Sequence, residues 1–160
     1  MFSDERMGND FLAALAKMPK GSGLVFRHYA VARAERHALY EKARTIAKAR
    51  RMVVMLAGSA QQARGWRADG VHGAGGAFST APVHNLRELI AAERAGVDLV
   101  FISPVFATRS HIGGRALGYS GFARLALRSK VPVIALGGMT AARARTLRGA
   151  YGWAGIDAWL

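Results

Sequence analysis

The sequence predicts an α/β fold, a minimal (β/α)8 barrel (TIM barrel) with clipped termini. Short apolar runs alternate with segments of helical periodicity along the whole chain. These runs are continuous rather than alternating, which is typical of a parallel sheet covered by helices. The chain has 160 residues, whereas such barrels usually have about 250, so the predicted barrel is a small one. An open, doubly wound sheet is the alternative topology.

Seven strands are predicted, each next to a helix. The strands are residues 24–26, 52–56, 70–72, 78–83, 99–103, 132–136 and 156–160. The helices are residues 11–15, 32–50, 61–67, 85–95, 120–128 and 140–148. An eighth strand would have to precede Met1 or survive only as Met1 and Phe2. Asn85, Ser120 and Thr140 are expected to cap helices at their N-termini, and Gly96 and Gly149 to end helices in a left-handed conformation.

The chain is strongly basic, with 23 Lys and Arg against 10 Asp and Glu and a net charge of +13. Such a balance is typical of nucleic-acid binding or of a pocket for anionic ligands. The basic residues are spread over separate helical segments, and no basic run is interleaved with aromatic residues. No zinc-finger, RNP-like or stacking pattern occurs. We therefore expect small anionic ligands and no specific nucleic-acid partner.

Composition also sets the expected class and compartment. There are no cysteines, which excludes disulfides and thiolate chemistry. No apolar run approaches the roughly 18 residues that span a bilayer, and no signal-peptide pattern opens the chain. We expect one domain over residues 1–160, a cytoplasmic location and no membrane partner. Apolar residues at the clipped ends make a homodimer conceivable.

A polar loop and a glycine turn each follow an apolar run. Residues 108–111, Thr-Arg-Ser-His, come after the predicted strand 99–103, and Gly137 and Gly138 end the run 132–136. The carboxyl ends of barrel strands form the catalytic face. Cationic side chains and free backbone N–H groups at such ends are what phosphate-bearing ligands need. His111 is the candidate for proton transfer, because the ordinary pKa of histidine lies near neutrality.

The same stretch resembles the thiamine phosphate synthases and their thiazole tautomerase relatives. Ser-Pro-Val-Phe-Ala-Thr-Arg-Ser-His, residues 103–111, is similar to the family's Gly-Pro-Val-Phe-x-Thr-x-Thr-Lys loop after its sixth strand. Residues 132–138 resemble its seventh strand and phosphate-binding turn. Residues 25–29, 69–72 and 83–85 fall where the family has the ends of its second, fourth and fifth strands. The resemblance is specific between residues 97 and 138.

This resemblance implies a reaction that joins a pyrimidine-methyl diphosphate to a thiazole phosphate, with loss of diphosphate. Arg27 matches the family's strand-two arginine, which can clamp a phosphate bidentately; otherwise it would form an ion pair, with Glu41 as its partner. Arg27 and His111 are the implied catalytic residues. The residues implied to bind the phosphorylated substrates are Arg27, Thr108, Arg109, Ser110, Gly137 and Gly138.

The chain departs from the family where the family binds metal. Ala57 and Gly58 stand in place of an Asn-Asp pair, and residues 73–76, Gly-Ala-Gly-Gly, replace Gln-x-Asp. No metal ligand is therefore predicted, and Mg²⁺ is the expected cofactor only if synthase activity is retained. Three functions stay open: a thiamine phosphate synthase, a metal-independent thiazole tautomerase, and a non-catalytic binder of thiamine-type phosphates.

Overall fold

The computed structural model describes residues 1–73, 78–108 and 115–159. Its strands are β1 (Gly23–Phe26), β2 (Val53–Ala57), β3 (Gly70–His72), β4 (Ser79–Val83), β5 (Leu99–Ile102), β6 (Val133–Ala135) and β7 (Gly152–Trp153). Its α-helices are α1 (Asp10–Lys17), α2 (Arg33–Ala49), α3 (Ala60–Gly65), α4 (Leu86–Arg94), α5 (Gly118–Ala126) and α6 (Ala141–Ala144). Short 3₁₀ helices, η1 (Glu5–Met7) and η3 (Asp157–Trp159), lie near the two ends.

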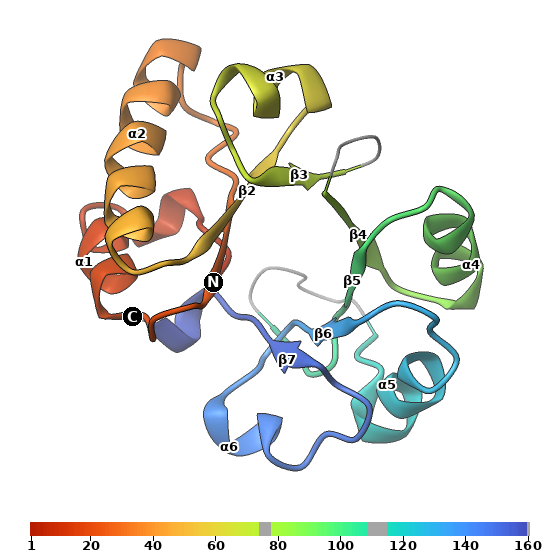
Figure 1. Cartoon of the computed structure of the whole chain (residues 1–160). Coiled ribbons are helices and arrows are strands. Elements are labelled where there is room, and N and C mark those ends of the chain that lie inside the picture. Colours follow the sequence, from red (N-terminus) through yellow and green to blue (C-terminus); the bar gives the residue numbers. More distant parts are fainter. Residues whose placement is uncertain (74–77, 109–114, 160) are drawn as a thin grey trace.

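The strands form one curled parallel sheet. Each strand pairs with the next along the chain, in the order β1 to β7, and every pairing is parallel. Figure 1 shows the strands curling around a centre with the helices outside them, and the N-terminus lying close to β7. This consecutive order excludes the doubly wound alternative, in which the strand order reverses.

The described residues form seven strands, and a complete eight-stranded barrel is not seen. Where the eighth strand was expected, Phe2 makes an isolated parallel bridge to Val25. The N–H of Phe2 donates to the carbonyl of Gly155 at 3.1 Å, and the N–H of Val25 donates to the carbonyl of Met1 at 2.9 Å. The first two residues thus link β1 to the segment after β7 without forming a full strand.

The C-terminal strand prediction is wrong. Residues 157–159 form η3, and the seventh strand is Gly152–Trp153. This strand pairs with β6, and backbone hydrogen bonds from Tyr151 to Val133 and from Ala154 to Ala135 flank the pairing. The predicted run, residues 156–160, lies beyond this strand, and it is interrupted by the charged residue Asp157. Trp159 instead stacks on Trp153, with 5.0 Å between ring centroids.

Most of the predicted caps are confirmed. The side chains of Asn85 and Thr140 accept hydrogen bonds from the backbone N–H groups of Glu88 and Arg143. Gly96 and Gly149 adopt φ of +70° and +80°, which is the left-handed region. Ser120 does not cap a helix, because α5 begins two residues earlier, at Gly118.

The core follows from the amphipathic helices. On α2 the residues Tyr40, Ala43 and Ala47 are buried, at helical spacing, and Tyr40 packs edge-on against Phe26 of β1. Apolar burial of this kind is the main stabilising contribution to the fold. Within the ranges that the structure describes, no helix is long and apolar enough to cross a membrane.

Candidate functional site

A cavity of about 200 Å³ opens at the carboxyl ends of the strands. Its walls come from segments that follow β1, β5, β6 and β7. Its lining includes the polar side chains of Arg27, Ser103, Thr108 and Asp157 and the two turn glycines, Gly137 and Gly138. Four of the residues predicted to bind phosphate, Arg27, Thr108, Gly137 and Gly138, therefore line one cavity. The other predicted residues, Arg109, Ser110 and His111, lie outside the described residues.

The glycine turn after β6 is compact and tolerates no side chain. Gly137 and Gly138 adopt φ of +92° and +61°. A Cβ on Gly137 would lie 2.7 Å from Cα of Pro104, and one on Gly138 would lie 2.6 Å from the carbonyl oxygen of Ala107. No described residue accepts a hydrogen bond from the N–H of either glycine. The turn thus offers free donors at the cavity, the arrangement expected of an anion site.

Arg27 directly follows β1 and supplies a positive charge at the cavity. One Nη of its guanidinium lies 3.4 Å from the carboxylate of Asp4. The ion pair suggested by the sequence, with Glu41, is not formed; Glu41 pairs instead with Arg44 and His37 on its own helix. Nε of Arg27 is buried and has no hydrogen-bond partner in the part of the chain that the structure describes. A buried donor of this kind is satisfied by a ligand or an ordered water.

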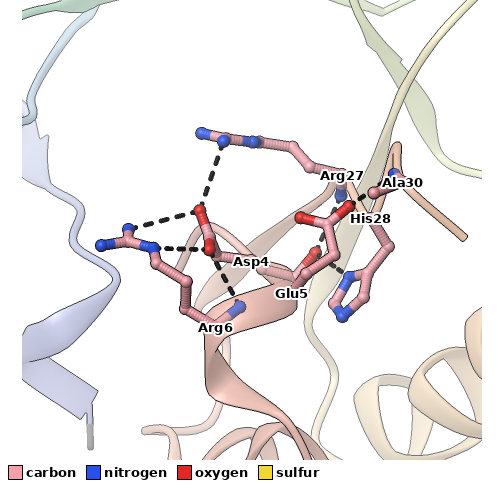
Figure 2. A network of polar contacts seen from close by, with 7 residues as sticks. Asp4, Glu5, Arg6, Arg27, His28 and Ala30 are labelled. Atoms are coloured by element: carbon pink, nitrogen blue, oxygen red, sulfur yellow. Dashed lines mark hydrogen bonds and ion pairs between the residues drawn. The ribbon is translucent and has the colours of Figure 1, made fainter. Parts of the chain in front are cut away.

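The N-terminal segment contacts both the backbone and the guanidinium of Arg27 (Figure 2). The hydroxyl of Ser3 accepts a hydrogen bond from the backbone N–H of Arg27 at 2.8 Å, and the same hydroxyl lies 2.9 Å from Nδ1 of His28. The carboxylate of Asp4 forms ion pairs with two arginines: with Nε of Arg6 at 2.8 Å, and with the guanidinium of Arg27. Burial alone would raise the pKa of Asp4, but its hydrogen bonds to Arg6 and the charges of Arg6 and Arg27 hold that pKa below its ordinary value.

Sequence reasoning missed Ser3, Asp4 and Asp157. Asp4 had one local signal, since its side chain also accepts from the backbone N–H of Arg6 and caps η1. Its partner Arg27 is 23 residues away, a separation that periodicity and local motifs do not cover. Asp157 lines the cavity and contributes to the raised pKa of Arg6, whose main cause is the hydrogen bond to Asp4.

An arginine side chain reaches the end of β2, one of the two places where the family that the sequence resembles has metal-binding acids; residues 74–76, at the other place, lie outside the described residues. Ala57 ends β2, and its carbonyl accepts from an Nη of Arg36 at 2.8 Å. Nε of Arg36 donates to the carbonyl of Arg27 at 2.8 Å. No group of three or more His, Cys, Asp or Glu that could hold a metal ion occurs among residues 1–73, 78–108 and 115–159. Mg²⁺ takes oxygen ligands, and the buried guanidinium of Arg36 does not fit a Mg²⁺ ion held at the end of β2.

Two histidines lie at the ends of strands near this face. Nδ1 of His72 lies 2.9 Å from the hydroxyl of Thr80, and burial together with the charge of Arg27 lowers the pKa of His72 to about 4. His72 is therefore neutral at pH 7. His84 contacts Glu88 at 2.7 Å through Nδ1, beside the cap of α4. Of the two, His72 faces the sheet interior, packed edge-on against Phe2 and Phe101.

A second, larger cavity of about 530 Å³ lies at the amino ends of the strands. Apolar side chains dominate its lining, among them Met18, Met55, Phe101 and Trp153, and Asp98 is the one charged side chain among the described residues that line it. A carboxylate repels phosphate, and the described part of its lining contains no pair of adjacent glycines like Gly137 and Gly138. The candidate phosphate site is therefore the smaller cavity at the carboxyl ends.

Comparisons with known proteins identify the family to which the chain is similar. The family model described as thiamine monophosphate synthase matches residues 2–159. A protein of Aquifex aeolicus (strain VF5) named "Putative thiamine-phosphate synthase 2" is 28% identical over 173 aligned residues, covering 98% of this chain and 93% of that protein. A thiamine-phosphate synthase of Methanoregula boonei is 44% identical over 59 residues, which cover 36% of this chain and 27% of that protein.

The fold is similar to that of a solved structure with a related name. The solved structure of thiamine phosphate pyrophosphorylase from Pyrococcus furiosus superposes with a TM-score of 0.84 at 21% identity, covering 98% of this chain and 83% of that one. That structure supports the curled parallel α/β sheet. The family-model match spans nearly the whole sequence, and the chain therefore belongs to the thiamine monophosphate synthase family.

Proposed function

We propose that this chain binds a thiazole phosphate and a pyrimidine-methyl diphosphate at the carboxyl ends of its strands and joins them into thiamine phosphate. The observation that carries the proposal is the cavity in which Arg27 and the glycine turn, Gly137 and Gly138, meet. Membership of the family supplies the class of substrate. The proposed location is cytoplasmic.

In the proposed reaction the bond between the pyrimidine methylene carbon and the diphosphate oxygen breaks, and its electron pair leaves with the diphosphate. The thiazole nitrogen then donates its lone pair to the methylene cation and forms the new C–N bond. Positive charge and fixed N–H donors placed at the phosphates stabilise the charge that develops on the leaving group. Arg27 supplies the charge, the glycine turn supplies N–H donors, and Thr108 adds a hydroxyl.

Arg109, Ser110 and His111 retain their proposed roles from the sequence. The first two extend the phosphate site from the loop after β5, and His111 acts as a loop cation or acid. No step is assigned to Mg²⁺, because Arg36 contacts the end of β2, where the family has one of its acids.

A second candidate function is a tautomerase that moves a proton on a thiazole carboxylate phosphate. The Arg36 contacts favour it, since that chemistry needs no metal. It requires a group that exchanges protons near pH 7, and His111 is the candidate. His72, with its pKa lowered to about 4, is a poor base for this purpose. A non-catalytic binder would share the phosphate site and lack turnover.

Formation of thiamine phosphate from the two phosphorylated precursors tests the proposal, with Mg²⁺ present and then removed by a chelator. Product that forms in both conditions supports a synthase whose cations are arginines. Product only with Mg²⁺ contradicts the metal assignment. No product from folded protein that binds thiazole phosphate overturns the synthase and leaves the tautomerase and the binder, which a proton-exchange assay separates.

A further inference from the structure

We infer that Asp4 is a positioning residue: it holds the guanidinium of Arg27 at the cavity in the orientation that binds phosphate. This inference rests on the proposed function, because it concerns the same phosphate site. As a carboxylate, Asp4 does not bind phosphate itself and contributes to the site through Arg27.

Arg27 needs an anchor for the end of its side chain. The side chain is 29% exposed, and its guanidinium carbon lies 6.0 Å from the ring centroids of both Phe2 and Tyr29, at the outer limit of a cation–π contact. An arginine side chain carries about 2 kcal/mol of rotamer entropy, which phosphate binding would have to overcome. In the described ranges, Asp4 is the one side chain that hydrogen-bonds this guanidinium.

Asp4 is itself held rigidly. Its side chain is only 9% exposed, it receives two nitrogens of Arg6, at 2.8 and 3.3 Å, and it caps η1. The residues before it are fixed to the sheet, with the N–H of Ser3 donating to the carbonyl of Val25 at 2.9 Å. The anchor thus has little freedom of its own.

The geometry leaves Arg27 available to a ligand. Only one nitrogen of its guanidinium contacts Asp4, and at 3.4 Å that contact is longer than the 2.8 Å contact between Asp4 and Arg6. Arg6 pairs with the same carboxylate at shorter distance, so the charge of Asp4 is shared between two arginines and does not fully cancel that of Arg27. In Figure 2 the guanidinium of Arg27 extends past Asp4, and the carboxylate lies to one side of it.

The opposite role for Asp4, as a competitor of phosphate, predicts the opposite change in phosphate affinity when its charge is removed. If the carboxylate held Arg27 away from phosphate as a competitor, its removal would strengthen binding, because one negative charge would leave the site. A positioning residue predicts weaker binding in spite of that gain. The Asp4→Asn variant distinguishes the two, since asparagine keeps the shape and the capping oxygen but loses the charge.

The test is a double-mutant cycle measured by calorimetric titration with thiazole phosphate. Asp4→Asn is expected to weaken binding three- to tenfold when Arg27 is present and not to weaken it in the Arg27→Met background. Asp10→Asn, an exposed change on α1 with the same loss of charge, should leave the affinity unchanged. Equal or tighter binding by Asp4→Asn, or the same weakening without Arg27, overturns the inference.

A second readout needs no ligand. The Nε–H resonance of Arg27, assigned by comparison with Arg27→Met, should shift and broaden in Asp4→Asn but stay unchanged in Asp10→Asn. If wild-type protein binds no phosphate compound while this resonance responds as expected, the proposed function fails and the anchoring by Asp4 stands. If the resonance is the same in Asp4→Asn as in wild type, Asp4 does not position Arg27.

Discussion

Replacing Gly138 with alanine should destabilise the protein and damage the phosphate site together. The new Cβ would lie 2.6 Å from the carbonyl oxygen of Ala107 and 2.9 Å from Cβ of Phe106, so the loop after β5 has to move. Overpacking of this kind costs about 1–3 kcal/mol. The left-handed backbone, at φ +61°, adds about 1–2 kcal/mol for a residue with a side chain.

Gly96 is the matched control. Its φ is +70°, and a Cβ there would have no atom within 4 Å. The Gly96→Ala variant therefore carries the backbone cost and the same change in the unfolded chain, but no crowding. The difference between the two variants isolates the crowding at about 1–3 kcal/mol.

Thermal and chemical denaturation of the two variants measure that difference. For a chain of this size about 1 kcal/mol corresponds to 2–4 °C in Tm, so Gly138→Ala should melt roughly 2–12 °C below Gly96→Ala. Because Thr108 is carried by the loop that moves, Gly138→Ala should also bind thiazole phosphate more weakly, and Gly96→Ala should not. Equal melting temperatures would refute the reasoning about the close approach of the turn to this loop.

Three further predictions concern buried polar groups. The hydroxyl of Tyr40 is buried with no partner among the described residues, so Tyr40→Phe should raise the free energy of unfolding by about 1–3 kcal/mol. Tyr151→Phe, at an exposed position, should leave that free energy unchanged. A loss of stability in Tyr40→Phe would contradict the structure. Arg36→Met leaves two backbone carbonyls without their donor and should cost about 2–5 kcal/mol in a urea titration, whereas Arg33→Met on the same helix should be near neutral. His72 has a folded pKa of about 4, below its ordinary 6.5, so between these values the unfolded state binds more protons and the free energy of unfolding falls as pH falls. The fall from pH 7 to pH 5 should be smaller in His72→Gln than in wild type, and an equal fall would show that His72 does not contribute.

The sequence predicted most of the sheet because its strands are continuous apolar runs between capped helices. The predicted runs 52–56 and 132–136 both contain strands of the parallel sheet, β2 and β6. The glycine turn was also foreseeable, since adjacent glycines after a buried strand indicate a backbone that other residues cannot adopt. The short β7 was not, because Gly152 and Trp153 form no apolar run and become a strand only by pairing with β6.

The supporting residues of the site were harder to predict. Arg36 lies on a helix whose exposed residues are mostly polar, and only the fold shows that its side chain reaches the ends of β1 and β2. Asp4 and Ser3 act on Arg27 across more than twenty residues of sequence. Such contacts depend on how the N-terminal segment lies against the end of β1 in the folded chain, and no local pattern encodes that.

We propose above that Arg27 and the glycine turn form a phosphate site at the carboxyl ends of the strands. Calorimetric titration of thiazole phosphate into wild type and Arg27→Met tests it most directly. Loss of a charged hydrogen-bonding partner corresponds to about 1.5–3 kcal/mol, so we expect an affinity at least tenfold lower in Arg27→Met, measured at a temperature at which both proteins are folded. Equal affinity in the two proteins would contradict it and place the phosphate elsewhere.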